Sequence, residues 1–181
     1  MNYRKIVGER IYLSPMSVDD VEQYAHWIND IEVSKYLNMH HMMFSLQGEL
    51  DYLTNTAQKG YNFAIVLKDG DRLLGSISLM DVNHKDRKAT LGLFIGDAEY
   101  RSKGYGAEAI ALILDYGFRW LNLHNIMLQV FSTNPRGLAC YKKVGFKEFG
   151  RRREAVFFDG KWADEIHMEI LDREWFCRGD L

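Results

Sequence analysis

The stretch that decides the fold is Arg101-Ser102-Lys103-Gly104-Tyr105-Gly106-Ala107. It lies between a strand-like run at residues 91–95 and a helix-like run at residues 104–122. Two glycines one residue apart at the start of a helix let the backbone approach a ligand closely, because no Cβ intervenes. The free N–H groups and positive dipole end of such a helix bind phosphate. The stretch therefore predicts a pyrophosphate site and a nucleotide-bearing cofactor.

Two common nucleotide motifs do not match this stretch. A dinucleotide fingerprint requires an acidic residue about 20 residues later, at a strand end, but the next strand ends in Ser132-Thr133-Asn134. A phosphate P-loop requires Gly-Lys-Ser/Thr, which is absent here. We therefore expect neither NAD nor ATP chemistry, and the plainer alternative is a tight strand–helix turn without a ligand.

The composition indicates one globular domain spanning residues 1–181. Apolar residues make up 47% of the chain and charged residues 27%, which is ordinary for a soluble protein. The net charge of −2 argues against nucleic acid as a partner. We interpret the basic run 151–153 as a solvated strand edge.

The cysteine content and the absence of long apolar runs indicate a cytoplasmic protein. Cys140 and Cys177 form no metal-binding spacing and suggest a reducing compartment. The N-terminus lacks the apolar segment of a signal peptide, and no run of about 18 apolar residues predicts a membrane span.

The expected elements form a mixed α/β sheet. Antiparallel hairpins come first, and strands then alternate with helices. The predicted strands are 10–15, 61–67, 72–80, 91–95, 125–131, 147–158 and 162–171, and the predicted helices are 17–28, 30–38, 45–58, 104–122 and a short one that starts at Asn134.

A second constellation lies at residues 134–146. Asn134 at a strand exit can hydrogen-bond a ligand amide, and Tyr141 follows seven residues later on the same helix face. The plainer alternative makes Asn134 a helix cap and Tyr141 a packing residue.

Together, the two motifs resemble the GNAT superfamily of acetyl-CoA-dependent N-acetyltransferases, and the resemblance extends to Trp175. Within that superfamily, the spermidine N-acetyltransferases and the ribosomal-protein N-terminal acetyltransferase-like branch are most similar. The resemblance implies a central mixed sheet of about six to seven strands flanked by helices. It also implies a splayed strand pair that admits the pantetheine arm of acetyl-CoA.

The resemblance also implies the site residues. The pyrophosphate would lie on residues 101–107, and the pantetheine arm would pair with residues 94–96. The full set of expected cofactor contacts is Phe94, Ile95, Gly96, Arg101, Ser102, Lys103, Gly104, Tyr105, Gly106, Ala107, Asn134 and Lys143.

The implied reaction is direct attack of an amine on the thioester. A backbone N–H near Phe94 or Ile95 would stabilise the oxyanion, and Tyr141 would be the general acid that protonates the departing thiolate. Cys140 could in principle form an acetyl-cysteine, but no His/Asp partner is identifiable, so we interpret it as a packing residue.

The general base is unassigned. Many relatives carry Glu where this chain has Thr90, which cannot act as a base, and Glu99 fits surface solvation better. Because an alkylamine with a pKa of about 10.4 is almost wholly protonated at neutral pH, a water relay or amine desolvation must help.

The resemblance implies that the acceptor is a primary amine of a small molecule or a peptide N-terminus. A polyamine requires acidic residues, and spermidine acetyltransferases carry clustered glutamates where this chain has the apolar run 36–44. Nearby acids that could partly substitute are Asp30, Glu32, Glu49 and Asp51. His40 and His41 are adjacent and do not predict a metal site.

Two other function classes stay open at this point. One is a non-catalytic acyl-CoA-binding or sensing protein, favoured by Thr90 at the base position. The other is a Rossmann-type nucleotide-binding protein, disfavoured by the early antiparallel hairpins. We expect acetyl-CoA as co-substrate, no metal, and neither a nucleic acid nor a membrane as partner. The sequence is compatible with a homo-oligomer but does not indicate one.

Overall fold

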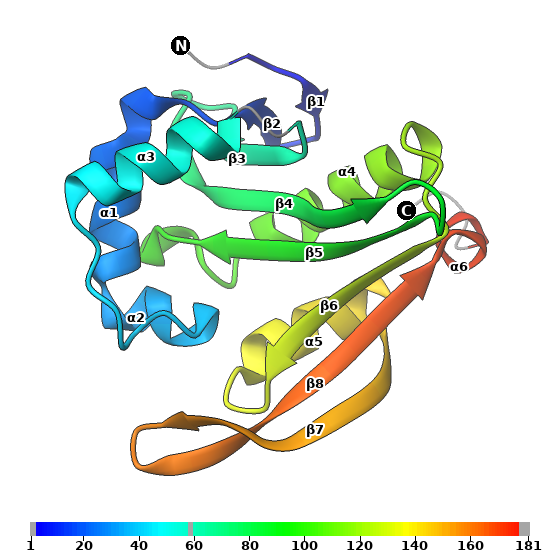
Figure 1. The fold of residues 1–181 in the computed structure, drawn as a ribbon. Helices are drawn as coiled ribbons and strands as arrows, with labels where there is room; N and C mark the ends of the chain where they lie inside the picture. The colour runs from blue at the N-terminus through cyan, green and yellow to red at the C-terminus, as the bar shows by residue number, and fades with distance from the viewer. Residues whose placement is uncertain (1–2, 58–59, 178–181) are drawn as a thin grey trace. The chain divides into compact units, whose positions relative to one another are not determined.

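The computed structural model describes residues 3–57 and 60–177. The chain divides into two compact units. The first comprises Met1–Ser78 and Leu93–Leu112, and the second comprises Leu79–Gly92 and Ile113–Leu181. Figure 1 labels the helices and strands of both units.

Eight strands form one mixed sheet with the order β1-β2-β3-β4-β5-β6-β8-β7. The sequence predicted six to seven strands, and the additional one is β1, a two-residue strand that pairs with β2. The strands are β1 Ile6–Val7, β2 Ile11–Pro15, β3 Asn62–Leu67, β4 Leu73–Asn83, β5 Lys88–Ile95, β6 Asn125–Phe131, β7 Lys147–Phe158 and β8 Lys161–Leu171.

The helices agree with the prediction in kind and differ at their ends. The predicted helix 17–28 begins as the 3-10 turn η1. The Ser17 hydroxyl caps this turn by accepting a hydrogen bond from the Asp19 amide. The predicted helix 30–38 is divided into a short α-helix and a 3-10 turn, and residue 58 of the predicted helix 45–58 lies outside the described residues. The helices are η1 Val18–Asp20, α1 Val21–Asn29, α2 Ile31–Ser34, η2 Lys35–Leu37, α3 Leu46–Ala57, η3 Ala98–Tyr100, α4 Tyr105–Arg119, α5 Pro135–Val144 and α6 Asp172–Phe176.

The first unit has its core between the sheet and the N-terminal helices. In Figure 1, α1 lies beside α3 and α2, and it contacts both helices. One cluster of buried side chains joins these helices to the residue that follows β2 and to β5. Its members are Met16, Tyr24, Trp27, Val33 and Leu53, with Phe94 packed against them.

The second unit is built around β6, β7 and β8. Alternate residues of β6 are buried, and each faces a buried residue of the antiparallel β8. The pairs are Ile126 with Ile170, Leu128 with Met168, and Val130 with Ile166. Period-2 burial of this kind is expected for a strand with one face toward the core.

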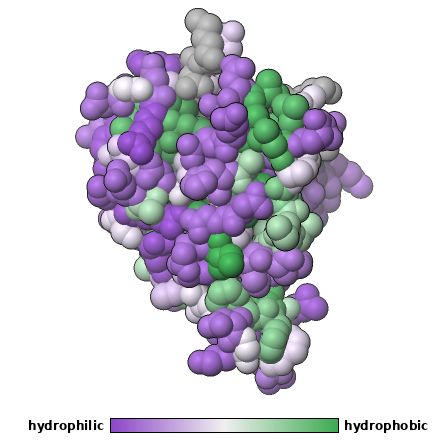
Figure 2. All heavy atoms as spheres, turned by 90° about the vertical axis from the view of Figure 1, so that its left-hand side faces the viewer, coloured by the Kyte–Doolittle hydropathy of each residue, from purple (hydrophilic) through white to green (hydrophobic). Residues whose placement is uncertain are grey.

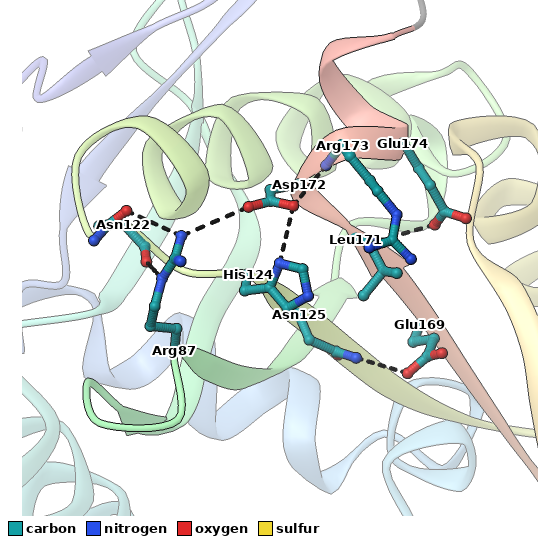
Figure 3. Close-up of polar contacts among 9 residues, drawn as sticks. All are labelled: Arg87, Asn122, His124, Asn125, Glu169, Leu171, Asp172, Arg173 and Glu174. Atoms are coloured by element: carbon teal, nitrogen blue, oxygen red, sulfur yellow. Dashed lines mark hydrogen bonds and ion pairs between the residues drawn. The ribbon is translucent and has the colours of Figure 1, made fainter.

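A polar network holds α6 to the rest of the second unit (Figure 3). The Asp172 carboxylate accepts from the Arg173 amide and lies 3.0 Å from Nδ1 of His124. Arg87 donates to the backbone and side chain of Asn122 and lies 3.6 Å from Asp172. Neither α6 nor this network was predicted from the sequence.

The surface that faces the viewer in Figure 2 is mostly hydrophilic, with separate hydrophobic patches. Within the described residues, no helix is long and apolar enough to cross a membrane.

Candidate functional site

The predicted phosphate loop has the backbone that a helix N-terminal anion site needs. Ser102 and Gly104 both have positive φ, 61° and 89°, and α4 begins directly afterwards at Tyr105. The first intrahelical bond runs from the Glu108 amide to the Gly104 carbonyl at 3.0 Å. The amides that precede Glu108 in the first turn have no intrahelical acceptor, so they can receive an anion.

Arg101 binds the end of β5. Its Nε donates to the Ile95 carbonyl at 3.0 Å, and its Nη2 donates to the Gly96 carbonyl at 2.7 Å. Arg101 is one of the cofactor contacts expected from the sequence, and in the structure its guanidinium ties the loop to the end of β5.

Arg10 is a residue that sequence reasoning missed. Its Nε donates to Oε2 of Glu108 at 2.9 Å, and its Nη1 donates to the Lys103 carbonyl at 3.0 Å. The same guanidinium lies 4.4 Å from the centre of the Tyr105 ring and against the open side of Gly104. Arg10 therefore fixes the loop and the first turn of α4 together.

A second ion pair holds the turn between β5 and α4. Arg72 Nη2 lies 2.7 Å from Oδ2 of Asp97, and Oδ1 of Asp97 accepts from the Glu99 amide and caps η3. The Arg72 guanidinium lies 5.0 Å from the centre of the Tyr100 ring. Glu99 itself is exposed, as the sequence suggested.

Two glycines allow β5 to lie close to its neighbours. A Cβ on Gly96 would overlap the Trp27 indole, and a Cβ on Gly75 would overlap the Phe94 carbonyl. The Phe94 ring makes edge contacts with Tyr24 and Trp27. The end of β5 is thus fixed by the helical core of the first unit.

The residues that follow β5 are hydrogen-bonded to β4. The Gly96 amide donates to the Leu74 carbonyl of β4 at 2.9 Å, and the Asp97 amide reaches the same carbonyl at 3.4 Å. The Ile95 N–H comes directly before these two amides and remains the expected donor to the cofactor in this strand.

Asn134 begins α5 in the second unit. Its Oδ1 accepts from the Gly137 amide at 2.9 Å, and Pro135 occupies the first turn. This is the helix cap that the sequence left as an alternative. The cap uses one of the two lone pairs of the side-chain oxygen, and Nδ2 is available as a donor to a ligand carbonyl.

Tyr141 lies on α5 and is 9% exposed. The centre of its ring lies 6.0 Å from that of Phe146, and its hydroxyl makes no hydrogen bond within residues 3–57 and 60–177. Burial and the neighbouring Cys140 raise the pKa of Tyr141, so its hydroxyl stays protonated at neutral pH. A hydroxyl in this state can donate a proton or a hydrogen bond.

Cys140 and Lys143 lie on the same helix as Tyr141. Burial raises the pKa of the Cys140 thiol, although the Lys143 ammonium acts in the opposite direction. A thiol in its neutral form is a poor nucleophile. Lys143 itself is exposed to solvent.

Thr90 is half-buried in β5, where the strand runs parallel to β6. Residues Lys88–Thr90 of β5 pair with Asn125–Met127 of β6, and the described residues of the second unit show no further pairing between these strands. A hydroxyl at position 90 cannot act as a base.

The predicted site residues therefore form two sets. The first unit brings together the end of β5, the phosphate loop and the start of α4, and it adds Arg10 and Glu108 to them. The second unit brings together Asn134, Cys140, Tyr141 and Lys143 on α5. Within the described residues, no group of three or more His, Cys, Asp or Glu side chains could hold a metal ion.

Residues 10–147 match the family model described as an acetyltransferase (GNAT) domain. A spermidine N(1)-acetyltransferase of Vibrio cholerae is 34% identical over 116 residues, which cover 64% of this chain and just under two thirds, 66%, of that protein. The probable N-acetyltransferase YjcK of Bacillus subtilis is 28% identical over 91% of this chain and 96% of its own length.

Solved structures give the same result. A spermidine N-acetyltransferase from Vibrio cholerae, solved in complex with CoA and spermine, superposes with a TM-score of 0.82 at 26% identity, over 92% of this chain and 98% of that one. This agreement excludes the Rossmann-type alternative, because the fold is that of the acetyltransferases. The family model covers more than half of the chain, so the chain belongs to the GNAT family of acetyl-CoA-dependent N-acetyltransferases.

Proposed function

We propose that this chain transfers the acetyl group of acetyl-CoA to a primary amine of a small molecule. The observation that carries the proposal is the loop 101–104, which presents the first-turn amides of α4 and is braced by Arg10. Those amides and the helix dipole suit the pyrophosphate of acetyl-CoA. A Vibrio relative whose structure contains CoA and spermine supports both the cofactor and the amine class.

The proposed cofactor contacts are the predicted residues, with changed roles for Arg101 and Phe94. Ser102 to Ala107 would hold the pyrophosphate through backbone amides, with Lys103 adding charge. Arg101 would act indirectly, because its guanidinium already binds the carbonyls of Ile95 and Gly96. The Ile95 N–H would then serve the pantetheine arm or the oxyanion, and Phe94 would support the strand.

In the second unit, Tyr141 is our candidate for the general acid. The thiolate of CoA must gain a proton when it leaves, and a buried tyrosine stays protonated across the neutral range. Asn134 through Nδ2 and Lys143 through its ammonium would assist in cofactor binding. The neutral thiol of Cys140 favours direct attack over an acetyl-cysteine intermediate.

Loss of the amine proton has no assigned base, because Thr90 cannot accept it. A protonated alkylamine at neutral pH is about 10³-fold more abundant than the neutral form, a penalty of about 4 kcal/mol. We propose that desolvation of the amine in the site, or a water relay, lowers this penalty.

The acceptor is a small primary amine, with polyamines included, and a peptide N-terminus is the alternative acceptor. We further propose that residues 1–181 act as one acetyltransferase domain, since the family model spans parts of both compact units. Self-association is also part of the proposal, because a Vibrio spermidine N-acetyltransferase of the same fold has a dodecameric structure. Light scattering on the purified protein tests it.

The test of the proposed function is CoA release from acetyl-CoA in the presence of separate amines. Spermidine, spermine, amino acids, amino sugars, aminoglycosides and short peptides make up the panel. We expect release that depends on one class of small amine. Release only with peptides would move the acceptor to a peptide N-terminus, and no release despite acetyl-CoA binding would indicate an acyl-CoA sensor.

A further inference from the structure

The strands of the second unit have one buried face and one open face. The buried face carries Ile126, whose side chain lies against Gly117 of α4. The other face carries the alternate residues of β6, and among them Gln129 is exposed to solvent although β6 has a strand on either side. A polar side chain exposed in the middle of an interior strand shows that none of the described helices covers this face at Gln129.

An imidazole and a carboxylate lie together on this open face. His167 of β8 is the register partner of Gln129, and Glu165 is the partner of Phe131. Nε2 of His167 lies 3.0 Å from Oε1 of Glu165, and the two side chains are only 22% and 17% exposed. Partial shielding from water strengthens the attraction between such groups.

The carboxylate determines which ring nitrogen can accept a proton. A carboxylate beside Nε2 favours the tautomer that carries its proton there, so the lone pair is on Nδ1. Nδ1 of His167 makes no hydrogen bond with the described residues. Histidine is the commonest general acid or base in enzymes, and a carboxylate that orients the ring is a recurring part of that arrangement.

The other charged groups around the imidazole have partners of their own or lie in solvent. Glu169, two residues further along β8, accepts from Nδ2 of Asn125 at 2.7 Å. Lys147, the partner of Glu169 on β7, forms an ion pair with α6. Arg152, the partner of Glu165 on β7, is exposed. The carboxylate of Glu165 is therefore the charged group in direct contact with the ring.

The pair lies beside the loop that carries a proposed cofactor contact. The Ser132 amide, directly after β6, donates to the Asp164 carbonyl at 2.9 Å, and the Asp164 amide donates to the Ser132 hydroxyl at 3.0 Å. These bonds hold the end of β6 against the residue that precedes Glu165. Asn134 begins α5 two residues after Ser132. The pair and Asn134 are therefore held at the same end of β6.

We propose that His167, oriented by Glu165, is the general base that removes the proton from the acceptor amine, either directly or through one water molecule. The inference rests on the proposed function and supplies the base that Thr90 cannot provide.

The protons balance in this scheme. Nδ1 of His167 takes one proton from the substrate ammonium, and the neutral nitrogen attacks the thioester carbon. As the carbon–sulfur bond breaks, Tyr141 protonates the thiolate, and the second proton lost by the nitrogen restores the tyrosine. His167 returns its proton to solvent. Each turnover therefore yields one amide, one CoA thiol and one free proton.

The test measures kcat/KM for the amine at saturating acetyl-CoA, in the wild type and in His167→Gln, between pH 7 and pH 9.5. The acceptor probes are spermidine and 2-phenylethylamine. At pH 7 we expect the variant to be about 10²-fold slower. The difference should fall below about tenfold at pH 9.5, because an alkylamine with a pKa of about 10.4 then supplies its neutral form without help. A residue with a merely structural role would give the same deficit at every pH.

His124→Gln is the matched control, because it removes another imidazole paired with a carboxylate in the same unit, just before the start of β6. It should keep the wild-type kcat/KM at both ends of the pH range. Acetyl-CoA affinity by calorimetry and the melting temperature show whether His167→Gln is folded. We expect both to be retained, since glutamine keeps a polar side chain of similar size on this open face.

The two proposals fail in different ways. Equal rates for the wild type and His167→Gln at pH 7, a deficit that stays constant up to pH 9.5, or the same deficit in His124→Gln would overturn the inference, while acetylation by the wild type would retain the proposed function. A wild type that binds acetyl-CoA but acetylates neither probe would refute the proposed function for alkylamines, and the inference with it.

Discussion

Arg10 and Glu108 are joined by two hydrogen bonds although 98 positions separate them in the sequence. The Arg10 amide donates to Oε1 at 2.8 Å, and its guanidinium Nε donates to Oε2 at 2.9 Å. The Glu108 side chain is mostly buried, with 14% exposure, against 42% for Arg10. This pair fixes β2 and the first turn of α4 while Arg10 also holds the Lys103 carbonyl.

Arg10→Met should weaken acetyl-CoA binding by about tenfold, because the loop loses the hydrogen bonds that hold its backbone in place. Binding of acetyl-pantetheine, which lacks the pyrophosphate, should not change. Calorimetry with both ligands measures the difference. Arg4→Met is the matched control, since Arg4 forms an exposed ion pair with Asp71 in the same unit. Equal affinities for wild type and Arg10→Met would show that the loop does not depend on Arg10.

Gly96→Ala should destabilise the first unit by about 1–3 kcal/mol or more, because the new methyl group overlaps the Trp27 indole. Gly60→Ala is the control, since a Cβ there meets nothing within 4 Å. Urea unfolding gives the free energies for both variants. If Gly96→Ala unfolds like the wild type, then α1 and β5 are not packed as tightly as the structure indicates.

The local pattern of apolar and polar residues predicted most of the helices and strands. The helix and strand ends moved by up to three residues, as at α4, whose predicted range 104–122 became Tyr105–Arg119. That helix ends early because Asn122 takes a positive φ of 53°, which leads the chain into β6. Strand β1 was not predicted, because a strand of two residues is too short to show an alternating pattern of apolar and polar residues.

The site was predicted less completely, for a physical reason. Gly104 and Gly106 could be read from the sequence because their spacing is local. The partnership of Arg10 with Glu108 could not, because only the fold brings the two together. Arg101 was identified as a functional residue, but its hydrogen bonds to Ile95 and Gly96 depend on how the turn after β5 closes.

Tyr141→Phe should lower kcat by about 10²-fold or more while leaving the affinity for acetyl-CoA unchanged, because a general acid acts only in the chemical step. The melting temperature should not fall, since the hydroxyl has no hydrogen bond among the described residues.

The pH profile adds a second readout for Tyr141. Burial raises the pKa of this tyrosine above its usual value of about 10, so its ionisation should cause no loss of rate below about pH 10. Full kcat in Tyr141→Phe between pH 6 and 9 would remove Tyr141 from the mechanism.

Asp172→Asn should lower the free energy of unfolding by about 1 kcal/mol, because it weakens the contacts with His124 and Arg87 that hold α6. Burial alone would raise the pKa of Asp172, but the hydrogen bonds from His124 and the Arg173 amide, together with the charge of Arg87, lower it overall.

The sign of the pH effect follows from that lowered pKa. The unfolded chain then binds the proton more readily, so the stability that Asp172 contributes is present above about pH 4 and is lost as the pH falls through the folded-state pKa. Acid unfolding followed by circular dichroism should show a shallower loss in Asp172→Asn than in the wild type. Asp81→Asn, an exposed carboxylate in the same unit, should behave like the wild type.

Acetyl transfer from acetyl-CoA to a primary amine can be followed by mass spectrometry of the products that the purified protein forms from acetyl-CoA labelled in the acetyl group. The acceptors are spermidine, 1,4-diaminobutane and the N,N,N′,N′-tetramethyl form of the diamine. We predict labelled N-acetyl products from the primary amines and none from the tertiary one. Absence of a labelled product from every primary amine in the panel, with acetyl-CoA still bound, would show that the protein does not transfer acetyl groups to these amines.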